Sequence, residues 1–391
     1  MECKVFTFIL IAFIFNYCGS LQIKEVSGSS QLNIRRKRGF AVPSKYQWNS
    51  NKKYFIHNNV HYYTIYRAIS NIEKYTCLKF TQVYGEEEAD ISFIWGSNCF
   101  SESISFFNLD ATKRIHLHYQ CYRDIVHVQR LIHNVLGATP EVNRYDRDMY
   151  VNIYRQNIKN DSLIFFKKEK QNISTTFNLG YDYGSFTHYY SKAFSKNDKA
   201  TILAKEYSKF YAKLVNHKRN ATFNDFKLLY LQYCLKKSCR KSKIKCKFNG
   251  YLNPNNCTKC ICPPGRSGNT CEKEQSSSKG CGTLQLKAEK FNQTLRLYDN
   301  IECHYLITSD DGYKIEIYIE NMRFPFSEKC SSSYGLEIKY QKDKGATGLV
   351  LCGLHSRIKV LSKSRQVVLN YYSFRDNEYA DIKFRQTKKQ N

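Results

Sequence analysis

The sequence lacks a long apolar run outside its first twenty residues, and this excludes a helix that crosses a membrane later in the chain. The apolar run from Val5 to Phe15 is itself too short to span a bilayer. It follows one early lysine and precedes small residues, which is typical of a secretory signal peptide. We therefore expect a signal peptide at residues 1–20, cleavage near Ser20, and a secreted, extracellular protein with no membrane span.

Internal repeats and low-complexity tracts are also missing, and 31 Tyr with 25 Phe exclude a disordered chain. Acidic residues are scarce, with 34 Asp and Glu against 61 Lys and Arg. Residues 1–38 hold six basic and two acidic residues, so the rest of the chain keeps a net charge of +23. This charge favours anionic partners such as sulfated glycans, matrix or acidic lipid headgroups. Nucleic acid is not expected as a partner outside the cell.

The cysteine count indicates an oxidising compartment. Of sixteen cysteines, Cys3 and Cys18 leave with the signal peptide, and the remaining fourteen form an even number suited to disulfides. Five glycosylation sequons agree with passage through the secretory pathway: Asn160, Asn172, Asn220, Asn256 and Asn292.

The segment from residue 21 to residue 38 ends in RRKR, directly before Gly39. Four consecutive basic residues predict a short propeptide that a convertase cleaves after Arg38. The alternative is an exposed basic turn that is not cleaved.

Residues 39–235 form one long segment with few prolines and mixed periodicity. Residues Tyr150 to Ile158 and Ala89 to Trp95 alternate like strands, whereas Val60 to Tyr75 and Ile125 to Leu136 have helical spacing. These patterns predict an α+β domain.

Residues 236–272 begin with a basic stretch, Lys236 to Lys247, and contain six cysteines from Cys239 to Cys271. A segment this short cannot bury a sufficient core, so disulfides must hold it. Its C-x-C spacing and trailing glycines resemble an epidermal-growth-factor-like (EGF-like) module. A zinc finger at CTKC is the weaker alternative in an oxidising compartment. The basic stretch is either a solvated linker or a site for anionic glycans.

Residues 281–388 follow the short linker SSSKG and contain several alternating stretches, among them YKIEIYIE and RQVVLNYY. These predict an all-β sandwich. The GCG start and two consecutive cysteine pairs resemble a CUB domain. Gly335 stands where calcium-binding members of that family carry Asp, so we expect no calcium site.

The order of signal, basic cleavage site, α+β domain, EGF-like module and CUB domain resembles the astacin family of metalloproteases in its nematode arrangement. The motifs that carry this resemblance are YTCLKF, ADISFIWGSNCFS, DRDMYVNIYRQNI, YDYGSFTHYYSKAFS and FNDFKLLYLQYC. The resemblances imply seven disulfides: Cys77–Cys234, Cys99–Cys121, Cys239–Cys257, Cys246–Cys260, Cys262–Cys271, Cys281–Cys303 and Cys330–Cys352.

Members of that family carry HExxHxxGxxHExxRxDRD, and the RxDRD of this chain, Arg144 to Asp148, fixes the register. The three zinc-binding histidines are then replaced by Arg130, Asn134 and Pro140, and the catalytic glutamate by Leu131. In an active enzyme the bound zinc lowers the pKa of its water to about 7 and the glutamate takes the proton. None of the four residues performs these roles, so we expect no zinc, no other cofactor and no catalytic residues.

Neighbouring residues do not replace the lost ligands. His133 is one residue away from the required position, which rotates it by about 100° on a helix. His127 and His133 lie on different helix faces, and His188 is a lone histidine. In the Met-turn region Thr187 replaces the family methionine. Tyr189 matches the family tyrosine that assists catalysis, and we expect it to pack in the cleft.

Further expectations follow from the resemblance. Residues 21–38 contain no aspartate that would cap a zinc ion. The new amino terminus at Gly39 is expected to pair with Glu141, which would organise the fold. The acidic and basic residues of RxDRD are expected to form a local ion-pair and capping cluster.

The sequence therefore favours a pseudoprotease that binds peptides, extracellular proteins or matrix. One alternative is an active zinc endopeptidase with a non-standard metal site. A second is a matrix or adhesion protein that acts through its EGF-like and CUB modules.

Overall fold

The computed structural model of this chain describes residues 49–102, 112–171, 174–215, 220–235, 238–325 and 330–388. The predicted signal peptide and propeptide, with Ser20, Arg38 and Gly39, lie outside these ranges, as does Asn172. Within these ranges, no helix combines the length and the hydropathy needed to cross a membrane.

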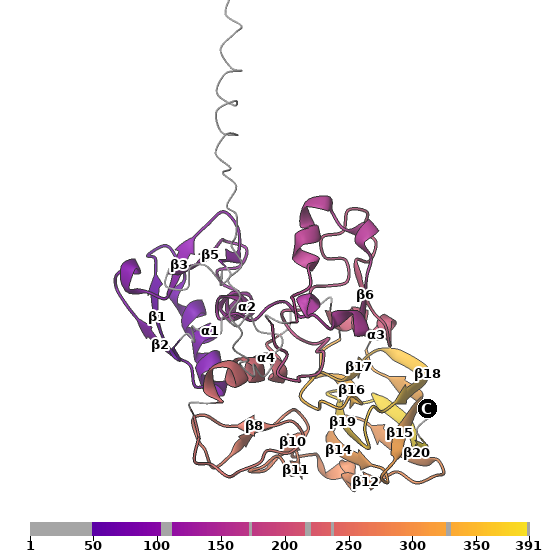
Figure 1. Cartoon of the computed structure of the whole chain (residues 1–391). Helices are drawn as coiled ribbons and strands as arrows, with labels where there is room; N and C mark the ends of the chain where they lie inside the picture. Colours follow the sequence, from indigo (N-terminus) through magenta and orange to yellow (C-terminus); the bar gives the residue numbers. More distant parts are fainter. Residues whose placement is uncertain are drawn as a thin grey trace, which may run out of the picture. The chain divides into compact units, whose positions relative to one another are not determined.

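The first domain, residues 49–235, contains a five-stranded sheet with strand order β2-β1-β3-β5-β4 (Figure 1). Its strands are β1 (Asn51–Ile56), β2 (Lys79–Gln82), β3 (Ile91–Trp95), β4 (Phe100–Ser101) and β5 (Lys113–Leu117). The pairs β1–β2, β1–β3 and β3–β5 are parallel, whereas β4 runs antiparallel to β5. β4 is therefore a short antiparallel strand at the edge of the sheet.

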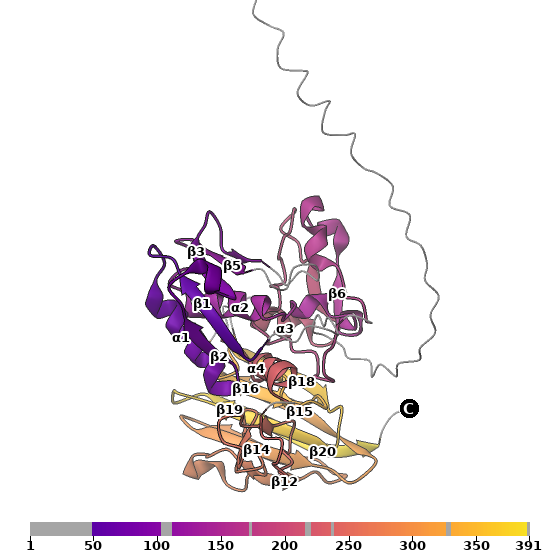
Figure 2. The same ribbon diagram turned by 60° about the vertical axis from the view of Figure 1, so that its left-hand side comes forward.

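Two helices, α1 (Tyr62–Tyr75) and α2 (Ile125–Val135), pack with the sheet in one apolar core (Figure 2). In α1 the residues Ile65, Ile69 and Ile72 recur at helical spacing and are buried, while Tyr62 and Tyr66 are exposed. Both helices form where the sequence predicts them, with ends shifted by one or two residues.

The second half of this domain is mostly irregular. Its regular elements are β6 (Val151–Ile153), β7 (Ile202–Ala204), α3 (Ser208–Val215), α4 (Phe223–Leu229), a π-helical turn (Tyr230–Cys234) and the 3-10 turns η2 to η5 (Glu141–Asn143, Arg147–Met149, Arg155–Asn157 and Asn160–Phe166); an earlier 3-10 turn, η1 (Glu86–Glu88), precedes β3.

The strand predicted from Tyr150 to Ile158 is wrong beyond Ile153. β6 pairs only with β7, which is three residues long. After it the backbone of Tyr154 leaves the extended region, with φ −96° and ψ 79°, and residues 155–157 form a 3-10 turn. The alternating sequence pattern continues after Ile153, but the partner strand β7 has no residues left to pair with it. The pattern therefore predicted a longer strand than forms.

Seven disulfides join the described cysteines: Cys77–Cys234, Cys99–Cys121, Cys239–Cys257, Cys246–Cys260, Cys262–Cys271, Cys281–Cys303 and Cys330–Cys352. Each joins the two cysteines that the resemblances pair.

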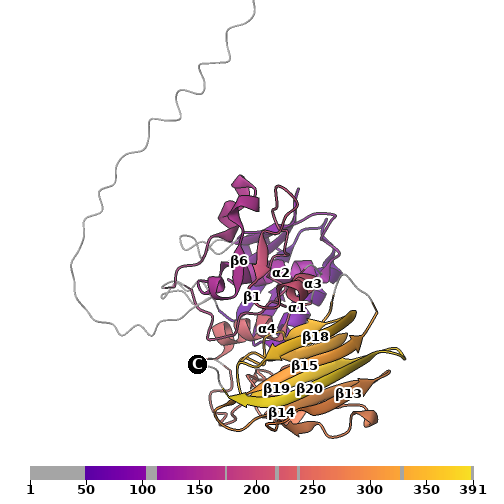
Figure 3. The ribbon, with the colours of Figure 1, turned by 90° about the vertical axis from the view of Figure 1, so that its right-hand side faces the viewer.

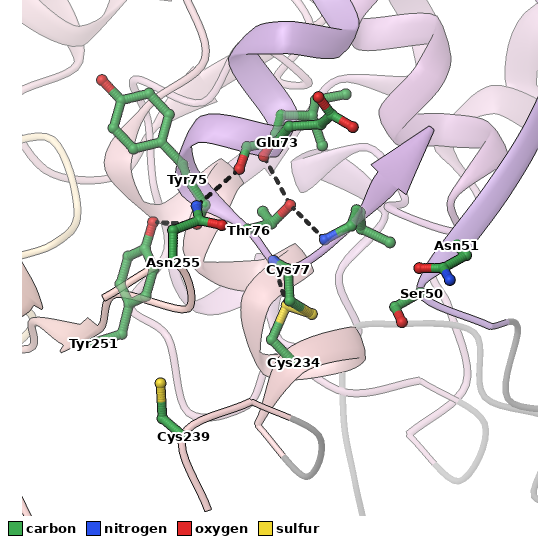
Figure 4. The surroundings of a disulfide bond; sticks show 12 residues. Ser50, Asn51, Glu73, Tyr75, Thr76, Cys77, Cys234, Cys239, Tyr251 and Asn255 are labelled. Carbon is green, nitrogen blue, oxygen red and sulfur yellow. Dashed lines mark hydrogen bonds between the residues drawn. A yellow bond between two sulfur atoms is a disulfide. The ribbon is translucent and has the colours of Figure 1, made fainter. Parts of the chain in front are cut away.

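The Cys77–Cys234 disulfide ties the end of α1 to the turn after α4 (Figure 4). Beside it the Thr76 hydroxyl donates to the carbonyl of Ile72 at 2.7 Å, and the Tyr251 hydroxyl donates to the carbonyl of Tyr75 at 3.1 Å. These bonds satisfy carbonyl groups that the end of a helix leaves without partners.

The disulfide-rich module, residues 238–275, consists of two short hairpins, β8 (Tyr251–Leu252) with β9 (Cys260–Ile261) and β10 (Arg266–Ser267) with β11 (Lys273–Glu274). The Arg266 guanidinium lies 3.9 Å from the ring centre of Phe248 and pairs with Glu274 at 2.8 Å. This charge-assisted contact supplements the three disulfides in a module with little apolar core.

The C-terminal sandwich, residues 281–388, packs two antiparallel-rich sheets, as predicted (Figure 3). Its first sheet contains β12 (Gln285–Lys287), β14 (Glu302–Thr308), β19 (Gln366–Tyr372), β16 (Gly335–Lys339) and β17 (Leu349–Leu351). The second contains β13 (Gln293–Tyr298), β20 (Tyr379–Lys388), β15 (Tyr313–Arg323) and β18 (Leu354–Leu361). A 3-10 turn, η7 (Lys279–Cys281), precedes it.

Gly335 has a structural reason to lack a side chain. Its φ is +102°, and a Cβ atom there would lie 2.4 Å from the carbonyl oxygen of Leu351. Aspartate cannot occupy this position without moving the backbone, so a calcium ligand does not fit here.

The end of α2 is fixed by Gly137, which has a φ of +94°. The Gly137 amide donates to the carbonyl of Asn134, and the Ala138 amide donates to the carbonyl of His133, both at 2.9 Å. These two bonds are those of a Schellman motif, in which glycine is the favoured residue. The turn that follows α2 is therefore set by the backbone, without any metal.

We predict that Gly137→Ala lowers the free energy of unfolding of the first domain by about 1 kcal/mol, because a left-handed backbone is strained for alanine. The matched control is Gly280→Ala, where the nearest atom to a new Cβ lies 3.8 Å away and the backbone is not left-handed. Denaturant unfolding of both variants checks this, and equal stabilities would contradict it.

Candidate functional site

A cleft of about 550 Å³ lies between α2, the edge strand β4 and the loop from residue 186 to residue 194. Its lining includes Arg130, Leu131, Asn134 and Pro140, the four positions that the motif assigns to zinc ligands and catalytic base. Thr187 and Tyr189 line the same cleft. The four positions on and after α2 therefore share one cleft with the loop that carries Thr187 and Tyr189.

Arg130 lies on α2, half-buried, at the first ligand position. Its Nη2 is 3.2 Å from Nδ1 and 3.4 Å from Nε2 of His127. Because these distances are almost equal, the guanidinium lies over the face of the imidazole ring rather than along one nitrogen lone pair. Among the described residues no carboxylate lies within 4.0 Å of it. Burial lowers the pKa of Arg130, and Asp124 and Tyr189 act against this; an arginine nevertheless stays charged at neutral pH.

The other three replaced positions offer no zinc ligand or base. Leu131 is 5% exposed and belongs to the core of the first domain. Asn134 has a side-chain oxygen that is buried and without a hydrogen-bond partner. Pro140 precedes the 3-10 turn η2 and has no donor atom on its side chain.

His133 does not compensate for these replacements. It is 1% exposed, and its ring packs edge-on against Phe186 and Phe226 at 4.8 and 5.9 Å. Burial lowers its pKa to about 3, so it is neutral at physiological pH. It does not line the cleft that contains Arg130, in agreement with the rotation expected from its position on the helix.

His188 and His127 are also unsuitable. Nε2 of His188 lies 2.9 Å from the Tyr181 hydroxyl and Nδ1 lies 2.7 Å from the carbonyl oxygen of Tyr189, so both ring nitrogens have partners. His127 lies close to the sulfurs of Cys99 and Cys121 in a group of potential metal ligands. Those sulfurs form a disulfide and are not thiolates. The residues of the cleft therefore do not fit a zinc ion.

Tyr189 is half-buried in the cleft, as expected, with its ring against Phe166 and Phe194. Burial raises its pKa to about 12, although the nearby Arg130 acts in the opposite direction. Thr187 is held by a contact of 2.9 Å between its hydroxyl and that of Ser185. The Ser185 hydroxyl in turn donates to Asp225 at 2.6 Å.

The RxDRD residues form a buried ion-pair network. Arg144 pairs with Glu141 and Asp146, each at 2.9 Å, and donates to the carbonyls of Leu179 and Gly180 at 3.1 Å. The expected ion pairs are present, but η2 and η3 have no side-chain capping bond, so the capping part of the prediction is wrong.

Arg147 reaches inward instead of capping a turn. It pairs with Asp148 at 3.2 Å and donates to the carbonyls of Val142 and Phe166 at 2.6 and 2.5 Å. Because the backbone carbonyls are its acceptors, Arg147 joins the turn after α2 to the 3-10 segment η5.

Beside this network lies a small cavity of about 30 Å³, lined by the carboxylates Glu141, Asp182 and Asp225. Glu141 accepts from the Asp182 amide at 2.8 Å and from Arg144. Burial raises the pKa of Glu141 to about 7 and that of Asp225 to about 6. The sequence did not identify Asp182 and Asp225 as site residues, although both lie within quoted motifs, YDYGSF and FNDFKLL.

Comparison with known proteins places these residues in a family. The model of the family "Astacin (Peptidase family M12A)" matches residues 41–234. Zinc metalloproteinase nas-34 of Caenorhabditis elegans is 29% identical over 346 residues, which are 86% of this chain and 55% of that protein. Zinc metalloproteinase nas-23 of the same organism is 31% identical over 229 residues, 56% of this chain and 42% of that protein. The chain thus spans about half the length of these relatives.

Solved structures match with lower overall similarity. High choriolytic enzyme 1, a hatching enzyme zinc-protease from Oryzias latipes, matches with a TM-score of 0.41 and 23% identity, over 46% of this chain and 86% of that chain. The CUB1-EGF-CUB2 domain of human MASP-1/3 matches with a TM-score of 0.23 and 14% identity, over 38% of this chain and 57% of that chain.

The predicted multidomain architecture is confirmed: an astacin-like protease domain, a disulfide-rich region and a β-rich C-terminal region. Through residues 41–234, this chain belongs to the astacin family, peptidase family M12A, as a homologue of its metalloproteases.

Proposed function

We propose that this chain is a secreted pseudoprotease that binds peptides, extracellular proteins or matrix and does not hydrolyse them. The convergence of Arg130, Leu131, Asn134 and Pro140 in one cleft carries this proposal. It supports an astacin frame in which the expected positions for ligands and base hold a cation, an alkyl group, an amide and a pyrrolidine ring.

The chemistry of these side chains opposes hydrolysis. A guanidinium at the first ligand position repels a divalent cation and has no lone pair to offer. Leu131 cannot accept a proton from water, so the general-base step also has no residue to perform it.

The cleft nevertheless suits an extended peptide. The edge strand β4 borders it with Phe100 and Ser101, and an edge strand is where a peptide adds by main-chain pairing. Phe186, Ala193 and Phe194 supply apolar walls. Binding in this mode needs no metal.

Secretion is supported by the disulfides and by the exposure of the sequons. Disulfides of this number persist in oxidising compartments. Asn160, Asn220, Asn256 and Asn292 are exposed in the structure, so each is accessible to glycosylation.

The first alternative is an active zinc endopeptidase, and metal content separates it from the proposal. We predict that the chain cleaved after Arg38 contains no stoichiometric zinc and does not cleave casein or gelatin, because the cleft lacks a donor set. Metal analysis and a cleavage assay with and without chelator check this. One zinc per chain with chelator-sensitive cleavage would overturn the pseudoprotease proposal.

A variant with the four family residues restored tests whether the cleft still has the backbone geometry of an astacin zinc site. We predict that Arg130→His, Leu131→Glu, Asn134→His and Pro140→His together bind one zinc per chain, because two histidines at i and i+4 and a third after the glycine turn then face one cleft. Metal analysis of the folded variant measures this.

Its control shifts the histidines by one residue, with Gln129→His and Thr139→His beside the native His133. These positions do not line the cleft together, and Gln129 and His133 are buried, so this variant should bind no zinc. Zinc binding by the control alone would show that the register is wrong.

The second alternative is adhesion through the C-terminal half, and the chain offers one surface for it. Within Lys236 to Lys247 the described residues Lys241, Lys243, Lys245 and Lys247 are all exposed. They alternate with half-buried residues, so the four ammonium groups lie on the exposed side of this segment. This row of charges suits a sulfated glycan.

We predict that Lys243→Gln with Lys245→Gln elutes from immobilised heparin at a lower salt concentration than the unmodified chain. The control, Lys196→Gln with Lys199→Gln, removes the same charge at exposed positions of the first domain. Equal elution of the two variants would show that only the net charge matters.

The buried carboxylates give the amino terminus at Gly39 a proposed receptor. The cavity beside Glu141 has room for about one water-sized group, and three carboxylates line it. A terminal ammonium there would pair with Glu141, whereas in the uncleaved chain Glu141 lacks that partner.

The pairing of the Gly39 ammonium with Glu141 predicts that the stability of the chain depends on pH. In the uncleaved chain the folded state raises the pKa of Glu141 to about 7, so the free energy of unfolding falls as the pH rises from about 4.5 to 7. A buried ammonium lowers that pKa again. The cleaved chain should therefore gain stability over an Arg38→Ala chain, and the gain should grow between pH 5 and pH 7, as melting curves would show.

In the cleaved chain Glu141→Gln should cost about 3–5 kcal/mol, because it leaves a buried charge without its partner. Glu87→Gln, at an exposed carboxylate, is the control. No change in melting temperature for Glu141→Gln would contradict the pairing.

A further inference from the structure

Arg130, which is half-buried, differs in its partners from Arg144 and Arg147, the buried arginines described in the first domain. Arg144 donates to two carboxylates and two carbonyls, and Arg147 donates to one carboxylate and two carbonyls. In the part of the chain that the structure describes, the one hydrogen-bonding partner of Arg130 is the ring of His127, which it meets through Nη2. Among the described residues its Nε and Nη1 donate to no acceptor.

A guanidinium with unused donors can bind a further anion. It presents parallel N–H donors whose spacing matches a carboxylate, and such bidentate pairs are stronger than neutral hydrogen bonds. Apolar side chains, among them Phe186, Ala193 and Phe194, line part of the cleft around it, which weakens competition from water.

Among the described residues that line the cleft, no charged group forms a close ion pair with Arg130. The described part of the lining contains one carboxylate, Asp124, whose Oδ1 accepts from the His127 amide at 3.0 Å as the cap of α2. That carboxylate is farther than 4.0 Å from the guanidinium, so it forms no ion pair with Arg130. The cleft therefore has a positive centre in its floor.

The short length of the edge strand β4 favours a terminal carboxylate over an acidic side chain as the ligand of Arg130. β4 is two residues long, so a peptide paired with it gains little from main-chain hydrogen bonds. A peptide that ends in the cleft adds a charged anchor to this short pairing. A peptide that passes through the cleft has only an acidic side chain to offer, at a greater cost in side-chain entropy.

We propose that the cleft binds the carboxyl-terminal end of an extended peptide, with the terminal carboxylate on Arg130 and the preceding residues along Phe100 and Ser101. This inference rests on the proposed binding function of the cleft and names its ligand class. The bound peptide is held at its end, and no bond in it is cleaved.

Two pools of N-acetylated random hexapeptides test this, one with free carboxyl termini and one with amidated termini. The full chain cleaved after Arg38 is immobilised, and the captured peptides are identified by mass spectrometry. Isothermal titration then measures matched pairs of acid and amide. We expect the free acid to bind at least ten-fold more tightly than its amide.

Three variants separate the role of Arg130 from general charge. Arg130→Gln should abolish the preference for the acid, and Arg130→Lys should retain only part of it, because an ammonium lacks the planar fork. Arg123→Gln removes the same charge from an exposed position outside the cleft lining and should leave the preference unchanged. Melting curves without peptide should show Arg130→Gln as stable as the unmodified chain or more so, since it removes a half-buried charge without an ion-pair partner.

Each result of the peptide experiment leads to a different conclusion. Peptides that bind equally as acid and amide, or only through an internal Asp or Glu, would overturn the terminal-carboxylate assignment and leave the binding function standing. Binding of neither pool to the cleft would instead count against the proposed function. A loss of the acid preference in Arg123→Gln would show that long-range charge, and not Arg130, selects the ligand.

Discussion

The buried guanidinium of Arg144 is the contact on which the rest of the site depends. It joins Glu141 and Asp146 to the carbonyls of Leu179 and Gly180, so it ties the turn after α2 to the loop that carries Thr187 and Tyr189. These contacts hold the two walls of the cleft in place, and removing one partner of such a buried pair is costly.

Leu131 and Pro140 suit the backbone and the surroundings of the positions that they occupy. Leu131 adds a buried side chain to the core where a glutamate would need a polar partner. Pro140 occupies an extended backbone position before η2, with φ −53° and ψ 139°, which its ring favours. Arg130 is the exception, since it brings a charge into a half-buried cleft without an ion-pair partner among the described residues. A residue that costs stability and faces a cleft is better explained by ligand binding than by packing.

Much of this arrangement could be predicted from the sequence, because it depends on local periodicity or on motif register. The buried stripe of α1, the sandwich strands and the rotation of His133 away from the cleft are of this kind. The end of strand β6 and the direction of Arg147 could not be predicted, since both depend on where a distant segment stops or offers a carbonyl. The burial of Asp182 and Asp225 beside Glu141 was missed for the same reason: three carboxylates far apart in sequence meet only in the folded chain.

In the proposed pseudoprotease, a guanidinium in place of zinc keeps the sign of the charge in the floor of the cleft but changes what that charge can do. A zinc ion polarises a carbonyl and activates water, so it stabilises a transition state more than the bound substrate. A guanidinium donates fixed hydrogen bonds to an anion that is already present, and Leu131 provides no base to generate a nucleophile. Such a site stabilises its ligand in the ground state, where stronger contact prolongs binding without advancing a reaction. Under the proposed function, the frame that positions a peptide for cleavage in an active protease would instead retain a peptide.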